Sequence, residues 1–176
     1  MADLSLSSMT FSSAHAAADQ PHAAVSAFAT FCAARFGLKL LTVFAWDEGD
    51  DLCVRIWSNQ PESYPFPATK RMGPTEWGYT VLRERQPWCG RTRREIRAAF
   101  FDHELIESLG CGACLSAPIV WRDRVIGAVS VLDAEGAYGP ADAEALGRIT
   151  WTLIPALLTH RIDTAGQGLP VEKEKT

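Results

Sequence analysis

The sequence predicts an α/β domain of the α+β kind, built on a central antiparallel sheet. Two apolar runs rich in β-branched residues, 114–121 and 125–133, are separated only by a short charged connector. A connector this short allows a hairpin but no crossover, so the two runs are adjacent antiparallel strands. Apolar residues between Leu146 and Leu157 then recur at helical spacing, which predicts a closing helix.

Helical spacing of apolar residues and apolar runs around a short turn also predict the elements in the first half of the chain. Between residues 19 and 37, Val25, Phe28 and Cys32 recur three and four residues apart, which predicts a first helix. Pro21 suits its first turn and Gly37 its end. Residues 41–46 and 52–57 flank the turn-forming cluster 47–51, so they predict a second hairpin.

The middle of the chain is less regular. Four prolines between residues 58 and 74 predict a loop with one edge strand. Residues 75–85 then suit a short capped helix and 87–90 a short strand. Residues 92–108 suit a longer helix with an apolar stripe of Ile96, Phe100, Phe101 and Leu105. The sheet is therefore expected to have about six strands.

Composition restricts the class of protein. A chain of 176 residues with 47% hydrophobic content suits one folded unit, for which we expect residues 20–162, between a mobile tail at 1–19 and a disordered tail at 163–176. The net charge of -4 gives no attraction to nucleic acid or to an anionic membrane. Without a signal peptide or an apolar span, a cytoplasmic protein with mostly reduced cysteines is predicted.

Three segments resemble, in residue type and in order, the C-terminal half of a GAF domain: 117–119 around Pro118, 125–128 with Gly127, and 138–142 ending at Asp142. The resemblance implies terminal helices on one sheet face and lid helices, within residues 75–108, over a small-molecule pocket on the other. It also implies a homodimer through the terminal helices and a separate output protein. The residues expected at that dimer seam are Phe31, Trp151 and Leu158.

The function that we expect is that of a small-molecule-binding sensory or regulatory protein, with an aromatic or carboxylate-bearing ligand and with no cofactor or metal. Aromatic rings crowd the middle of the chain and could line such a pocket, although core is the more common role of any single ring. The rings are Trp57, Tyr64, Phe66, Trp77, Tyr79, Trp88, Phe100 and Phe101, of which Trp57, Trp77, Tyr79, Trp88 and Phe100 are the ligand-binding candidates. Six arginines between residues 83 and 97 could hold a carboxylate or form a solvated surface, with Arg91 as the inward candidate.

A stand-alone thiol enzyme is the alternative function. Cys89 lies beside the arginine cluster, where positive charge favours the reactive thiolate, and Arg91 and His103 could assist it. His103 could also act as a general base or a ligand donor. Cys111 and Cys114 have the spacing of a redox pair or of half a zinc site, and a composite site with Cys89 and His103 is a further alternative.

The sequence departs from the motifs of three GAF subfamilies, and these departures disfavour the ligand or the chemistry typical of each. The cyclic-nucleotide signature retains only an aromatic, Tyr138, and an acid, Asp142, and the bilin-attaching cysteine has no counterpart within 92–108. In free methionine-R-sulfoxide reductase, another GAF protein, the catalytic cysteines correspond to positions near Trp77 and Glu107. An enzyme of that kind would need relocated thiols, for which Cys89 and Cys111 are the candidates.

Overall fold

The fold is a six-stranded antiparallel sheet with helices on both faces, which confirms the predicted class and both predicted hairpins. The computed structural model describes residues 11–71 and 73–165, with side chains to residue 161. The strand order is β3-β2-β1-β6-β5-β4. The strands are β1 (Leu40–Asp47), β2 (Leu52–Ser58), β3 (Ala68–Arg71), β4 (Trp88–Gly90), β5 (Ala113–Trp121) and β6 (Arg124–Asp133).

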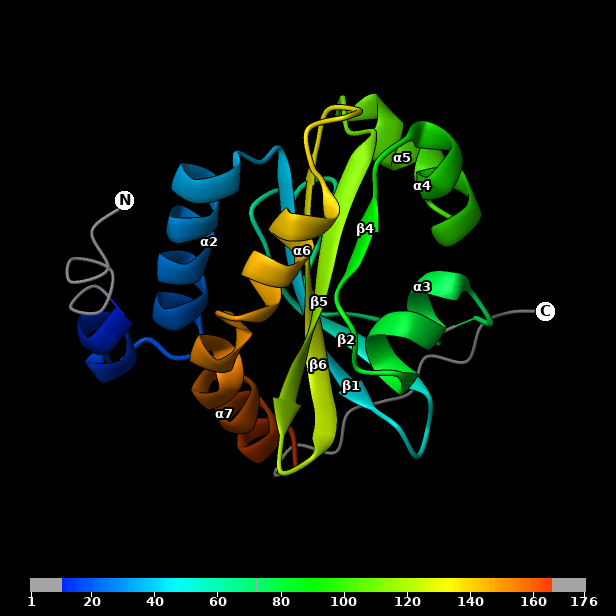
Figure 1. Cartoon of the computed structure of the whole chain (residues 1–176). Coiled ribbons are helices and arrows are strands. Elements are labelled where there is room, and N and C mark those ends of the chain that lie inside the picture. Colours follow the sequence, from blue (N-terminus) through cyan, green and yellow to red (C-terminus); the bar gives the residue numbers. More distant parts are fainter. Residues whose placement is uncertain (1–10, 72, 166–176) are drawn as a thin grey trace.

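The terminal helices cover one face of the sheet, which we call the helix face (Figure 1). They are α2 (His22–Phe36), α6 (Pro140–Gly147), the 3-10 turn η2 (Thr150–Leu153) and α7 (Ile154–Ala165). Gly37 ends α2 because its positive φ of 72° turns the chain while its N–H still donates to the carbonyl of Ala33. None of the helices in the described ranges combines the length and the apolarity needed to cross a bilayer.

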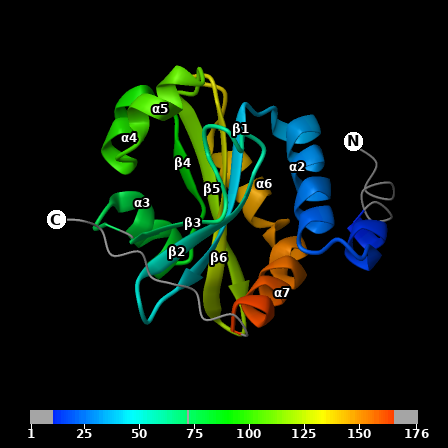
Figure 2. The same cartoon turned by 180° about the vertical axis from the view of Figure 1, so that it is seen from behind.

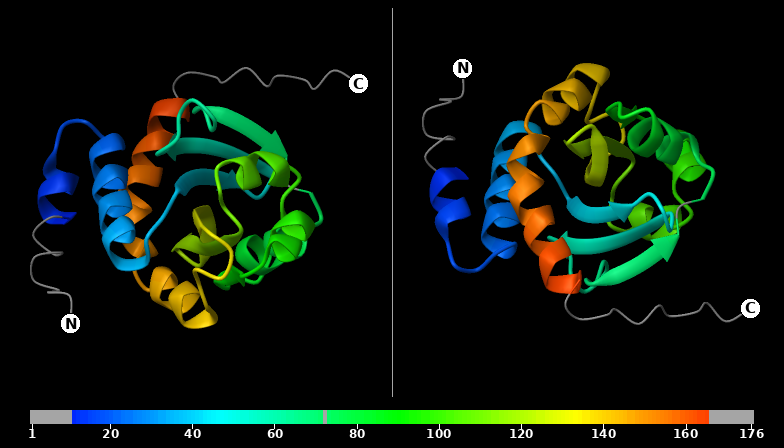
Figure 3. Two further views of the ribbon diagram at one scale, coloured as in Figure 1. Left: turned by 90° about the horizontal axis from the view of Figure 1, so that it is seen from above. Right: turned by 90° about the horizontal axis from the view of Figure 1, so that it is seen from below.

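The opposite, lid face is covered by short helical elements, as the view from behind and the views along the sheet show (Figures 2 and 3). These elements form the lid: α3 (Glu76–Gly78), the π-helical turn η1 (Tyr79–Arg83), α4 (Arg93–Ala99) and α5 (His103–Ser108). Strand β4 interrupts the lid and joins the edge of the sheet. The expected arrangement, with terminal helices on one face and a lid on the other, is therefore present.

The predicted helix at 92–108 is two helices. It begins as expected, with Thr92 and Glu95 in a reciprocal capping box. At Phe100 the backbone becomes extended, with φ -126° and ψ 125°, and α5 starts only at His103. The break turns Phe100 toward the sheet and leaves Phe101 79% exposed, whereas a continuous helix would have placed both on one apolar stripe.

Two hydrophobic cores lie on the two sides of the sheet, because successive strand residues point to opposite faces. In β1, Leu41 and Val43 join the helix-side core, and Leu40 and Phe44 join the lid-side core. The lid-side core includes fully buried Trp77.

A bulge in β2 changes which residues face the lid. Val43 pairs with Trp57 but Phe44 pairs with Arg55, so Ile56 is an extra residue and the alternation shifts by one. Arg55 therefore lines the lid-side cavity described below, while Trp57 joins the helix-side core, where its ring lies 6.4 Å from that of His22.

The structure describes residues 11–19 of the expected N-terminal tail. Residues 11–16 form a short helix in which Phe11 contacts the ring of Phe31 at 5.8 Å, and His15 Nε2 lies 2.7 Å from the carbonyl of Thr152. Residues 1–10 of that expected tail, and 166–176 of the expected C-terminal tail, lie outside the described residues. Of the expected dimer seam, Trp151 is 64% exposed and Leu158 packs against the helix-side core.

Candidate functional site

A small cavity lies on the lid face between the sheet and the junction of α4 and α5. Its volume is about 30 Å³, and its apolar wall consists of Leu40, Phe100, Ile106 and Leu132. A second space of about 180 Å³ adjoins it and extends toward Phe101. The two spaces share three lining residues, namely Phe44, Arg55 and Lys70.

A row of hydroxyl groups crosses the sheet beneath the lid. Thr42 pairs with both Ser58 and Ser130, and Ser130 pairs in turn with Ser116, so the four side chains share one face. All four are buried. The hydroxyls of Ser116 and Ser130 are 2.7 Å apart, and Thr42 and Ser130 line the cavity. The floor of the site therefore offers neutral hydrogen-bonding groups within an otherwise apolar core.

Two half-buried cations, Arg55 of β2 and Lys70 of β3, also face this space. The Lys70 ammonium lies 5.8 Å from the ring centre of Phe44 and 5.3 Å from that of Phe101. The Arg55 guanidinium lies 4.8 Å from the ring centre of Tyr64. Within 11–71 and 73–165, neither cation has a carboxylate at ion-pair distance. Burial lowers the pKa of both groups because it penalises their charged forms.

The one carboxylate in the cavity wall is already engaged. Asp102, which precedes α5, accepts a hydrogen bond of 2.9 Å from the hydroxyl of Tyr64. Its negative charge partly offsets the effect of burial on the pKa of Lys70 and of Arg55. The Tyr64–Asp102 bond also ties the loop between β2 and β3 to the α4–α5 junction.

Four of the candidate residues from the sequence lie together in the lid-side core. Trp77, Trp88, Phe100 and Cys111 all belong to it, and the Trp77 ring centre lies 5.9 Å from that of Phe44 and 5.7 Å from that of Phe100. Only Phe100 lines the cavity. The two indoles are therefore part of the packed core beneath the lid and do not line the cavity.

The remaining aromatic and basic candidates lie elsewhere. Trp57 is on the helix face, and Tyr79 is 62% exposed on the outside of the lid. Arg91 is exposed, as are the other arginines of its cluster. Several of them form surface ion pairs, such as Arg97 with Glu107. Of the two roles considered for this cluster, a ligand-binding group or a solvated surface, the structure shows the solvated surface.

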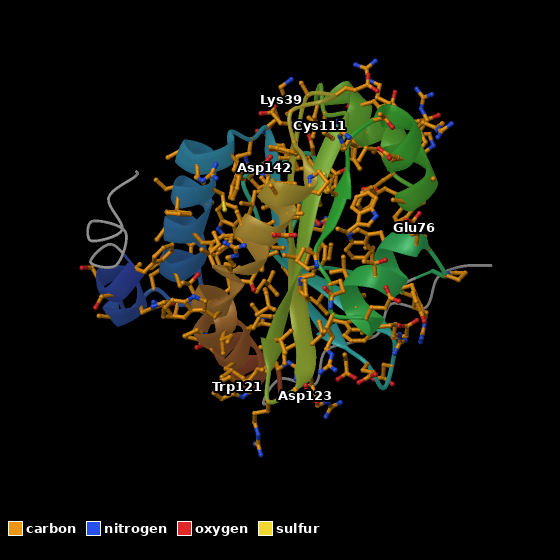
Figure 4. All side chains as sticks on the ribbon, viewed as in Figure 1. Lys39, Glu76, Cys111, Trp121, Asp123 and Asp142 are labelled. Carbon is orange, nitrogen blue, oxygen red and sulfur yellow. The ribbon has the colours of Figure 1, made fainter. Side chains whose placement is uncertain are left out.

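The proposed catalytic groups do not converge on the cavity. Cys89 packs against the helix-side core, and burial raises the pKa of its thiol, with Arg91 opposing that shift only in part. His103 Nδ1 lies 3.9 Å from a carboxylate oxygen of Glu107 and has no hydrogen-bond partner among the residues that the structure describes. Cys111, labelled in Figure 4 near one end of the sheet, is fully buried, with a pKa raised by burial to about 11.

The described residues include no cluster of three metal-ligating side chains, so the composite site of Cys89, His103, Cys111 and Cys114 is not assembled there. All five cysteines are free thiols.

Sequence reasoning counted Tyr64 among the aromatic rings that could line a pocket, but it missed the cavity's charged residues, namely Arg55, Lys70 and Asp102. Arg55 could have been found, because it is the single charged residue in the apolar run 52–57. It lies two residues from Cys53 along the strand, so both side chains point to the same face of the sheet, where Cys53 is buried. Lys70 gave no comparable signal, since it lies in a four-residue edge strand within a proline-rich segment.

Comparisons with known proteins agree with this architecture. No curated protein matches the sequence. The GAF domain of a phosphoenolpyruvate-protein phosphotransferase from Coxiella burnetii superposes with a TM-score of 0.72 at 15% identity, covering 92% of this chain and 96% of that chain. For the GAF domain of the Acinetobacter phosphotransferase the TM-score is 0.68 at 14% identity, with coverage of 94% and 99%.

Free methionine-R-sulfoxide reductase from Neisseria meningitidis, solved with its substrate, superposes with a TM-score of 0.61 at 13% identity, covering 89% of each chain. At these identities the likeness concerns the fold alone. The sequence profile of the GAF domain matches residues 21–150. This chain belongs to the GAF domain family.

Proposed function

We propose that this GAF domain is a sensory or regulatory module that binds a small molecule on its lid face. The observation that supports this most is the pair of cations, Arg55 and Lys70, facing an internal space without an ion-pair partner in the described part of the chain. Burying a charge without a partner is unfavourable, so the arrangement is poorly explained by stability alone. GAF domains commonly bind small molecules in sensory proteins, which agrees with this reading.

The size of the cavity requires the lid to move when a ligand enters. Its volume of about 30 Å³ is far below the roughly 300–1,000 Å³ that is usual for a small-molecule pocket. The adjoining space of about 180 Å³ is separated from it only by side chains that line both. Displacement of Lys70 or of the α4–α5 junction would join the two spaces.

The finer parts of the proposal concern the ligand and the partners. An aromatic or carboxylate-bearing ligand suits the apolar wall and the cations. Signal output through a separate protein, a homodimer through the terminal helices and a cytoplasmic location remain predictions.

A thermal-shift screen with aromatic acids, their neutral amides, amines and nucleotides tests the function. A ligand present at ten times its dissociation constant stabilises the native state by about 1.4 kcal/mol, which raises the melting temperature by roughly 3–6 °C. We expect at least one compound to do so. No stabilisation by any class of compound would contradict the proposal.

The chain's own thiols can locate the binding site. Cys53 is buried on the lid face beside the larger space, and Cys32 is equally buried on the helix face. A ligand beneath the lid should slow alkylation of Cys53, measured by mass spectrometry, more than that of Cys32. Equal slowing of both would mean only global stabilisation and would argue against this location.

A further inference from the structure

We propose that the ligand is a small organic anion whose carboxylate binds between Arg55 and Lys70 and supplies the ion-pair partner that neither cation has in the described part of the chain. This inference rests on the proposed function, because it specifies what that site binds. It assigns the charge of the ligand, the residues that hold its charged end, and the contact that its arrival would break.

The charges around the cavity do not balance. Arg55 and Lys70 supply two positive charges, and Asp102 is the only carboxylate among the described residues that line either space. Tyr64 and Cys53, the other titratable groups there, are neutral at physiological pH because burial raises the pKa of each. One positive charge is left over, and a monoanion would neutralise it where the low dielectric strengthens the attraction.

Both cations retain unused donors. Within residues 11–71 and 73–165, Lys70 makes no hydrogen bond and lies beside two rings, so its ammonium can still donate to an oxygen acceptor. Arg55 donates through Nη1 to the carbonyl of Pro65 at 3.0 Å, while its buried Nε has no hydrogen-bond partner in the same ranges. A guanidinium with an unmet, buried N–H is suited to a carboxylate, which accepts on two oxygens.

The rest of the wall favours an organic acid over an inorganic oxyanion. Leu40, Ile106 and Leu132 offer only apolar surface, and a phosphate or sulfate ion has no apolar part to bury against it. Thr42 and Ser130 can hydrogen-bond a polar substituent on the ligand. The expected ligand is thus a compact monocarboxylate with an aliphatic or aromatic body.

Binding would act on the lid through Asp102. A ligand carboxylate beside Arg55 and Lys70 repels Asp102 and replaces its attraction to the two cations. Asp102 is also the acceptor for Tyr64, so its displacement would release the bond between the β2–β3 loop and the α4–α5 junction. Loss of the Tyr64–Asp102 hydrogen bond would thereby couple ligand binding to a movement of the lid.

Calorimetric titration with paired compounds tests the inference. The probes are phenylacetate and hexanoate, their amides phenylacetamide and hexanamide, and inorganic phosphate. On the wild-type protein we expect the carboxylates to bind at least tenfold more tightly than the amides, and phosphate not to compete. Equal affinity for acid and amide, or tighter binding of phosphate than of either acid, would overturn the inference.

Matched variants locate the charge effect. Lys70→Met and Arg55→Met should each weaken carboxylate binding at least tenfold, whereas Asp102→Asn should strengthen it severalfold. Arg71→Met is the control, because Arg71 is exposed on the same strand and bonds to the carbonyl of Asp50. The assignment of the carboxylate to Arg55 and Lys70 would be contradicted if Arg71→Met weakened carboxylate binding as much as Lys70→Met does. It would also be contradicted if Asp102→Asn weakened carboxylate binding. Circular dichroism verifies that each variant is folded. If Arg55→Met does not fold, Lys70→Met alone tests whether the cations bind the carboxylate.

The two proposals fail in different ways. If only neutral or cationic compounds stabilise the protein and protect Cys53, the small-molecule function stands and the anion assignment is overturned. If no compound of any charge stabilises the protein, the function itself is contradicted.

Discussion

At the scale of single residues, Lys70 has the least favourable environment that we find around the cavity. Its ammonium lies between the rings of Phe44 and Phe101, and burial lowers its pKa. Cation–π contacts stabilise the ammonium by about 0.5–2 kcal/mol, whereas its partial burial penalises the charge. A perturbed charge without an ion-pair partner in the described part of the chain is typical of a functional site.

Replacing Lys70 should therefore not destabilise the free protein. We predict that Lys70→Met leaves the urea midpoint unchanged or raises it, because methionine fills similar space without a charge to desolvate. Arg71→Met on the same strand provides the comparison. A loss of more than about 1 kcal/mol in unfolding free energy would show that the ammonium stabilises the fold.

The indole of Trp77 and the phenol of Tyr79 provide a contrast between neighbours. Trp77 is 1% exposed and Tyr79 62% exposed, although the sequence made both of them site candidates. We predict that Trp77→Ala lowers the unfolding free energy by about 3–5 kcal/mol and that Tyr79→Ala changes it by less than about 0.5 kcal/mol. Urea denaturation measures both. A similar loss in the two variants would contradict the burial described above.

Cys89 should be an unreactive thiol. Burial raises its pKa, so a smaller fraction is thiolate near neutral pH than for an unperturbed cysteine. We predict that Cys89 reacts with iodoacetamide at pH 7.5 more slowly than free cysteine, as followed by peptide mass spectrometry. Reaction faster than that of free cysteine would revive the alternative of a thiol enzyme.

At the scale of elements, strand β6 contains a position that admits only glycine. A Cβ on Gly127 would meet the backbone carbonyl of Phe44 in β1 and a methyl group of Leu157 in α7. Backbone cannot yield as a flexible side chain does, so Gly127→Ala should destabilise the protein by about 1–3 kcal/mol. Gly73→Ala is the control, since nothing lies within 4 Å of its Cβ position. Equal urea midpoints for the two variants would contradict the close packing of β6 between β1 and α7.

The elements that the sequence predicted are those determined by local patterns. Both hairpins follow from alternating apolar runs around short connectors, and the start of α4 follows from the Thr92 cap. The break between α4 and α5 at Phe100 could not be predicted, because the spacing of apolar residues in 92–108 fits a continuous helix. The bulge at Ile56 was equally hidden, since pairing between strands rather than local pattern determines it, and it moved Trp57 to the helix face.

At the scale of the whole molecule, the lid-side thiols should make stability depend on alkaline pH. Burial raises the pKa of Cys111 to about 11 and those of Cys53 and Cys114 to about 12, from an ordinary value of 9.0. These thiols ionise in the unfolded chain first, so the stability they contribute is full below about pH 9 and is lost as the pH rises toward 11–12.

We therefore predict a lower urea midpoint at pH 9.5 than at pH 7.5. Replacing Cys111 with alanine should reduce that difference, because one ionising group is removed. A midpoint that stays constant over this range would contradict the burial of the thiols.

The overall architecture could be predicted further than the site. The order of hairpins and helices, and the residues around Pro118, Gly127 and Asp142, were sufficient to indicate the family, which the profile match confirms. The site could not be predicted to the same extent, because Arg55, Lys70 and Asp102 come from three separate segments and only folding brings them together. Locally clustered residues, such as the arginines between 83 and 97, drew attention instead and lie on the surface.

Titration of ¹⁵N-labelled protein with phenylacetate, followed by heteronuclear NMR, tests most directly whether the lid face holds a ligand. Saturable shifts should be largest for the amides of Arg55, Lys70, Phe100 and Asp102, with little change on the helix face near Leu157. Absence of saturable shifts at the lid-side residues, or larger shifts on the helix face, would contradict binding beneath the lid.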